Sequence, residues 1–182
     1  MISLTHTPTP HTTVTKLQWY SEHLPKMTQK SLVEIATNPK RGVMDPNERI
    51  VAIMIILKKG IESQDEVRPL LDLLKDENDY PLTTGTTHEK ENNASLRGDT
   101  AIALAKYGVK TQEFIEILIN LLKSIVMDPV FITKDTPSEY FMDFACALYI
   151  ADKDSIINEQ VMKAYTSKEM LDKYIRTSWK FI

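Results

Sequence analysis

Cysteine occurs once in this chain of 182 residues, at Cys146, so the protein can form no internal disulfide and no metal site of clustered cysteines. Positive charge is not in excess either, because 22 Lys and Arg stand against 25 Asp and Glu, which gives a net charge of −3. Non-specific binding of phosphates needs a surplus of basic residues on one face. The charge balance therefore disfavours nucleic acid as a partner.

Long apolar runs are also missing. The longest, Ile50 to Leu57, is far shorter than the roughly 18 residues of a membrane span. Residues 1–13 are rich in Thr and Pro, lack the basic start and apolar run of a secretory signal, and predict a flexible tail. We therefore expect a cytoplasmic protein without membrane contacts, in which residues 14–182 form a single domain.

Glycine is scarce, with five in the chain, and two of these glycines end copies of one pattern. The segment NERIVAIMIILKKG (Asn47–Gly60) is followed 48 residues later by SLRGDTAIALAKYG (Ser95–Gly108). In both copies an arginine precedes the glycine by eleven positions, and an apolar stretch lies between the two. Repetition at a fixed period is typical of stacked repeat proteins.

The similarity continues beyond each glycine into a second apolar pattern with the spacing i, i+3, i+4 and i+7. The residues are Val67, Leu70, Leu71 and Leu74 in the first copy, and Ile115, Leu118, Ile119 and Leu122 in the second. This spacing places each set on one stripe of a helix. Each unit is therefore predicted to be a first helix ended by glycine, a short turn and a second amphipathic helix.

Capping signals mark the predicted helix ends. Ser63 with Glu66 has the form of a capping box, and Thr111 is a suitable N-cap. The sequences DPNE at 45–48 and TPSE at 136–139 each combine a cap with proline at the first helical position.

The second of these signals begins a degenerate third unit, in which Asp152 takes the place of the turn glycine. Further helices are predicted near residues 14–24, 28–37 and 167–180. In total we expect eight to nine helices and no strand. An irregular helical bundle with chance similarity between its segments is the alternative.

The stretch RPLLDLLKD, followed later by SLRGDTAIALAKYG, resembles HEAT-like repeats of the armadillo type. The matching positions are Pro69, Leu70, Leu71, Leu74, Asp76, Arg97, Ala101, Ala103, Leu104 and Gly108. The resemblance covers residues 47–122 and implies an all-α fold. It implies, more specifically, a short right-handed α-solenoid of HEAT-like helical hairpins with capping helices.

Long polar connectors after each second helix depart from that family pattern. They comprise residues 38–47, 76–97 and 127–138. Because helices alternate in direction along a solenoid, these connectors should emerge along one edge, and long loops are often functional. We interpret this rim as a surface for a basic partner protein, with solvated spacers as the alternative. The residues predicted to bind the partner are Asp76, Glu77, Asp79, Tyr80, His88, Glu89, Glu91 and Phe131.

No set of catalytic or metal-binding residues is recognisable. The four histidines form no spaced pair of the kind that a helical zinc site requires. The run TTGTT at residues 83–87 lacks the GK[ST] ending of a phosphate-binding loop. Cys146 lies in the apolar segment FACALYI, where a buried inert thiol is expected. We therefore predict neither a catalytic site nor a cofactor nor a metal.

A non-enzymatic protein-binding module is the leading functional hypothesis, and an acidic inhibitor or immunity-type protein is one specific version of it. Two alternatives come from families that resemble the chain. HEAT-like bilin lyases imply an enzyme or chromophore-handling subunit, for which Cys146 would be the only thiol. HEAT-like DNA glycosylases imply a nucleic-acid reader, which would need a basic concave surface.

Overall fold

The computed structural model describes residues 13–38, 46–77, 85–127, 132–133, 136–153 and 166–178. Within this part the chain is all-α, as predicted, with eight α-helices and one short 3-10 helix. The helices are α1 (Thr13–His23), η1 (Leu24–Lys26), α2 (Gln29–Thr37), α4 (Pro46–Lys59), α5 (Gln64–Lys75), α6 (Thr87–Tyr107), α7 (Gln112–Val126), α8 (Glu139–Ala151) and α11 (Lys168–Ser178). The strands β1 (Ile132–Thr133) and β2 (Thr136–Pro137) form one antiparallel pair that the sequence did not predict.

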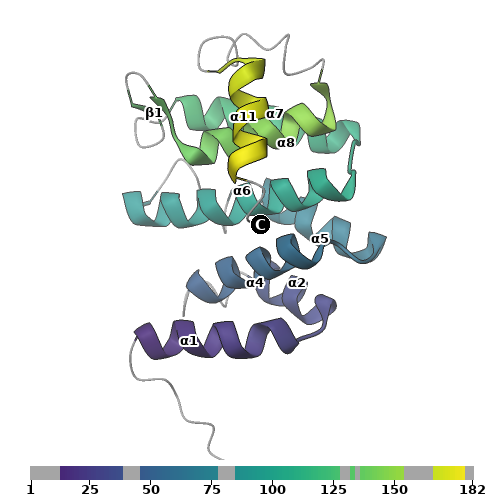
Figure 1. The fold of residues 1–182 in the computed structure, drawn as a ribbon, viewed down its shortest axis with the longest axis vertical. Coiled ribbons are helices and arrows are strands. Elements are labelled where there is room, and N and C mark those ends of the chain that lie inside the picture. Colours follow the sequence, from purple (N-terminus) through teal and green to yellow (C-terminus); the bar gives the residue numbers. More distant parts are fainter. Residues whose placement is uncertain are drawn as a thin grey trace, which may run out of the picture.

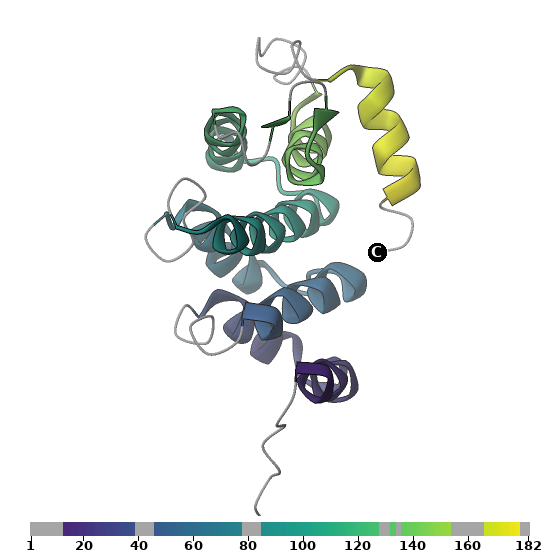
Figure 2. The same ribbon diagram turned by 90° about the vertical axis from the view of Figure 1, so that its left-hand side faces the viewer.

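The helices follow one another along the longest axis of the molecule, from α1 at one end to α7 and α8 at the other (Figure 1). The helix α6 lies at the centre because it packs against α4, α5 and α8. The helix α11 packs on α8, on the side away from α7 (Figure 2). Among the described residues no helix combines the length and the apolar character needed to cross a membrane.

The two glycines of the repeated pattern have the same backbone conformation. Gly60 and Gly108 follow α4 and α6 with φ angles of 89° and 96°, a left-handed region that favours glycine. The turn after each glycine leads directly into α5 or α7. Asp152, which the sequence aligned with these glycines, has an extended conformation with φ −148°. The predicted third unit thus has no left-handed turn at this position.

One predicted cap is confirmed and two are corrected, while Asp45 lies outside the described residues. Thr111 accepts a hydrogen bond from the backbone N–H of Phe114, as expected of an N-cap. Ser63 occupies the N-cap of α5, but it makes no capping hydrogen bond. The carboxylate of Glu66 instead accepts from the backbone N–H of Glu62. The predicted capping box is therefore wrong, because this carboxylate bonds one residue further upstream.

The beginnings of α6 and α8 also differ from the prediction. The helix α6 begins at Thr87, so the second half of the predicted 76–97 connector is helical. Its start is fixed by a complete capping box, in which Thr86 and Glu89 satisfy each other's backbone N–H. The helix α8 begins at Glu139 with Ser138 as its cap. The predicted cap at Thr136 is wrong, because this residue pairs with Thr133 in the short strand pair.

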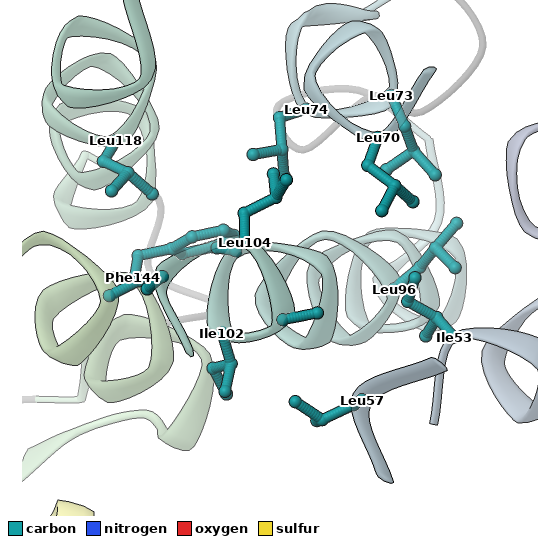
Figure 3. Packing of buried hydrophobic residues seen from close by; sticks show 14 of the residues in the cluster. Ile53, Leu57, Leu70, Leu73, Leu74, Leu96, Ile102, Leu104, Leu118 and Phe144 are labelled. Atoms are coloured by element: carbon teal, nitrogen blue, oxygen red, sulfur yellow. The ribbon is translucent and has the colours of Figure 1, made fainter. Parts of the chain in front are cut away.

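The predicted stripes form part of the core. Seven of the eight positions are buried, and the eighth, Ile119, is packed against the core while partly exposed. Leu74 of α5, Leu104 of α6 and Phe144 of α8 gather in one part of the core, and Ile53 of α4 contacts the region of Leu96 in another (Figure 3). The central helix α6 thereby joins the apolar faces of its neighbours.

Candidate functional site

Two buried arginines occupy equivalent positions in the repeated sequence pattern, and both donate to a backbone carbonyl near the end of an earlier helix. Arg49, 4% exposed, donates from Nε to the carbonyl oxygen of Ala36 at 3.0 Å. Arg97, 1% exposed, donates to the carbonyl oxygen of Leu74. Ala36 and Leu74 are each the residue before the last of their helix, α2 and α5. Since carbonyls in a last helical turn lack intrahelical partners, each arginine satisfies the end of the preceding unit.

The second of these arginines also binds the start of a connector. Arg97 donates from Nη1 to the Glu77 carboxylate at 2.6 Å, and the Glu77 side chain is 47% exposed. Burial lowers the pKa of the Arg97 guanidinium, and the charge of Glu77 opposes that effect. The pair therefore holds one predicted partner-binding residue at the junction of α5 and α6.

This ion pair lies at the edge of a groove of about 410 Å³ between α5 and α7. The lining residues are Leu74, Lys75, Glu77, Arg97, Glu113, Glu116, Ile117, Asn120, Leu121 and Ser124. Those of α7 recur at three- and four-residue spacing, so they share one side of that helix. The groove thus has apolar positions from both helices and carboxylates within the same wall.

A network of exposed ion pairs joins α5 to α7 beside this groove. Arg68 binds Asp72 on its own helix at 3.0 Å and Glu113 on α7 at 3.4 Å. Lys75 also binds Glu113, and this bond is the main reason that the pKa of Glu113 is lowered. Because these groups are solvated, the network adds little stability. Arg68 and Lys75 are therefore both already paired with carboxylates of the protein.

A second groove of about 520 Å³ lies between α2 and α5. Its lining residues are Lys30, Val33, Glu34, Thr37, Ser63, Asp65, Glu66 and Pro69. The two grooves lie on opposite sides of α5, and together they are lined by six acidic and three basic side chains, a net charge of −3. Their surroundings therefore favour a cationic ligand.

The predicted partner-binding residues that the structure describes do not form one cluster. Asp76 caps the end of α5, and Glu77 lines the α5/α7 groove. His88, Glu89 and Glu91 lie near the start of α6, and Glu89 is eight residues from Arg97, about 12 Å along the helix. Asp79, Tyr80 and Phe131 lie outside the described residues.

Two of the residues on α6 also have partners within their own helix end. The Glu89 carboxylate accepts from the N–H and the hydroxyl of Thr86, both at 2.8 Å, and the backbone bond is the main cause of its lowered pKa. The ring of His88 is hydrogen-bonded to the Asn92 amide at 3.2 Å. These contacts give both side chains a local role in ordering the first turns of α6.

The one thiol is enclosed. Cys146 is completely buried, and its Sγ lies 3.9 Å from the carbonyl oxygen of Leu171. Burial raises the pKa of this thiol, which leaves it protonated at neutral pH. Among the described residues no group of three or more His, Cys, Asp or Glu could hold a metal ion.

One perturbed carboxylate was not found from the sequence. Asp99 of α6 is partly buried, and burial is the first cause that raises its pKa to about 7, with the charge of Glu139 adding to it. One turn after Glu139 on α8, Asp143 accepts a hydrogen bond from the Tyr174 hydroxyl of α11 at 3.2 Å. Nothing in the local sequence distinguishes Asp99, because Glu139, the charge that adds to this rise, lies on the distant helix α8.

Comparisons of the chain with protein-family models, with curated proteins and with solved structures found no match. The two grooves and the bonds around them are therefore the features from which function can be inferred.

Proposed function

We propose that the chain is a HEAT-like helical-repeat protein, a short right-handed α-solenoid that acts in the cytoplasm as a non-enzymatic protein-binding module. Equivalent roles at the 48-residue offset support the repeat: Gly60 with Gly108 in the turns, and Arg49 with Arg97 against the preceding helix. Such repeats present extended surfaces for partners.

The contact surface in this proposal is the face that carries the two grooves, extended by the acidic residues at the connector ends, Asp76 and Glu77. The observation that carries the proposal is the pair of neighbouring grooves between α2, α5 and α7, with a net charge of −3. Grooves with an apolar lining and a few polar groups are the usual form of a binding site. An inhibitor of a basic protein is the version that this charge favours.

The test compares three baits in affinity capture from the native cells. One is the wild-type chain, one carries Asn120→Trp, which fills the α5/α7 groove, and one carries Glu169→Trp as the matched control. Glu169 is exposed on α11, which lies across α8 from α7 (Figure 2). We expect at least one protein to be retained by the wild type and the control but lost by the groove variant.

Retained proteins are then purified, and their binding is measured with the three chains. If every captured protein binds Asn120→Trp as tightly as the control, the groove face is not the contact surface. All three chains should have the same helical circular dichroism spectrum, because both substitutions are at exposed positions.

A further inference from the structure

Three exposed carboxylates in the two grooves have no cationic partner among the described residues. Glu116 lines the α5/α7 groove, and Glu34 and Asp65 line the α2/α5 groove. Among the described residues none of the three forms an ion pair, and Glu116 accepts only a hydrogen bond from the side chain of Gln112 on its own helix, at 3.0 Å. All three side chains are exposed. They can therefore accept charged donors from a ligand.

Most of the basic side chains near these carboxylates are already bonded to other groups of the protein. Lys75 is bonded to Glu113, and Arg97 is bonded to Glu77 and to the carbonyl oxygen of Leu74. Of the three basic side chains that line the grooves, only Lys30 has no such bond. Each groove therefore has an excess of negative charge that a ligand could neutralise.

Each groove has one partly exposed apolar side chain that can contact the stem of a long basic side chain. In the α5/α7 groove this is Ile117, one residue from Glu116. In the α2/α5 groove it is Pro69, which lies across from Glu34. Leu121 and Val33 line the grooves from beneath, since both are buried. Lys and Arg bury their methylene stems on apolar surface while the charged head stays at a polar edge. A purely apolar ligand would leave the carboxylates unused.

Resting on the proposed function, we propose that the two grooves take one extended basic segment of the partner protein, which crosses α5 and places one Lys or Arg side chain in each groove. The grooves touch α5 near its two ends, at Ser63 to Pro69 and at Leu74 to Lys75, so they are about 13 Å apart along the helix and about 10 Å apart across it, or about 16 Å in all. An extended chain advances about 3.3 Å per residue, with i and i+4 on the same side. Basic residues four positions apart, about 13 Å, therefore span the two grooves with the added reach of their side chains. The α2/α5 groove binds one basic residue at Glu34 and Asp65, and the α5/α7 groove binds the other basic residue at Glu116.

The probe is a set of 11-residue peptides with a Gly/Ser background and two arginines. One peptide has the arginines four positions apart, one has them one position apart, and one has a single arginine with Gln in the other position. Binding to the ¹⁵N-labelled full chain is followed by NMR at low ionic strength, which gives both affinity and location. We expect the four-apart peptide to bind most tightly and to shift amides of α2, α5 and α7.

Chain variants test the carboxylates directly. Glu116→Gln and the double change Glu34→Gln with Asp65→Asn should each weaken the four-apart peptide by about threefold to fivefold, since an exposed charge pair contributes up to about 1 kcal/mol. The single-arginine peptide can place its arginine in either groove, so each of the two variants should weaken its binding by less than it weakens that of the four-apart peptide. Glu169→Gln on α11, which removes the same charge outside the grooves, should have no effect.

The inference is overturned if Glu116→Gln binds the four-apart peptide like Glu169→Gln, or if the spacing of the arginines makes no difference. Its failure is separable from that of the proposed function. If Asn120→Trp abolishes binding of the captured protein while the three neutral substitutions leave it unchanged, the groove face binds a partner that is not a basic segment. If Asn120→Trp has no effect either, both proposals fail.

Discussion

Replacing Asp99 by Asn should stabilise the protein at neutral and alkaline pH. Asp99 is partly buried, and its pKa is raised from 3.8 to about 7, first by burial and then by the charge of Glu139. In the unfolded chain the carboxyl ionises near its ordinary pKa. The folded state therefore binds this proton more tightly, so the folded protein loses stability as the pH rises through 7.

The magnitude follows from the two pKa values. At about 1.36 kcal/mol per pKa unit, the ionised Asp99 disfavours the folded state by at most about 4 kcal/mol above pH 8. For 182 residues, an unfolding entropy of about 2.1 cal/mol/K per residue converts 1 kcal/mol into about 2.6 °C of Tm. Asp99→Asn should thus raise Tm by up to about 10 °C at pH 8.5, and the gain should shrink by more than half by pH 5.

Thermal and urea unfolding of both chains between pH 4.5 and 8.5 measures this difference. Glu139→Gln is the informative control, because it removes the second cause and leaves burial, so its gain above pH 7 should be smaller than that of Asp99→Asn. Glu22→Gln on α1 controls for the loss of an exposed carboxylate. Parallel stability profiles of Asp99→Asn and wild type over the whole range would refute the reasoning.

Three further predictions concern the packing of the helices. Leu118→Asp should abolish the helical circular dichroism signal at 25 °C, because Leu118 is fully buried and an unpaired charge there costs several kcal/mol. A normal melting curve would contradict the assignment of Leu118 to the apolar stripe of α7. Arg49→Met and Arg97→Met should each lower the free energy of unfolding in urea by about 1–3 kcal/mol, since a buried carbonyl loses its donor. The exposed control Arg68→Met should change it by less than about 1 kcal/mol. Equal effects of all three substitutions would contradict the special role of the two buried arginines. Gly98→Val should lower Tm through a loss of about 1–3 kcal/mol, because even a Cβ at this position would lie 3.2 Å from Oδ2 of Asp143, and an unchanged Tm would mean that α8 yields.

The parts of the fold that the sequence predicts are those that depend on near neighbours in the chain. The positive φ angles of Gly60 and Gly108 follow from residues that tolerate a left-handed turn, and α5 and α7 follow from their apolar spacing. The capping box of Thr86 and Glu89 was equally visible as T-x-x-E, but the glycine and threonines before it suggested a loop. At the start of α8 the sequence offers two residues that can cap a helix, Thr136 and Ser138. Ser138 is the cap because Thr136 pairs with Thr133 in the short strand pair.

The candidate site was less predictable, because it depends on how distant helices lie. Glu77 was identified from the acidic connector, but its partner Arg97 is 20 residues away in sequence. The α5/α7 groove exists because these two helices are held together mainly through α6 and α8 and touch each other little. No local sequence pattern around Glu116 or Asn120 indicates that α5 and α7 are separated by a groove. Asp99 is a similar case, since Glu139, which adds to the rise of its pKa, lies 40 residues away on α8.

The bonds of the two buried arginines have a consequence for how such a chain can change during evolution. The residue that accepts the bond is 13 positions before Arg49 in one case and 23 positions before Arg97 in the other. The same kind of bond is thus made with ten more residues between its ends. Most of these residues lengthen α6, which has ten residues before Arg97 where α4 has three before Arg49. Extra sequence is therefore accommodated at this junction mainly by a longer helix, and the bond between the buried arginine and the carbonyl stays in place.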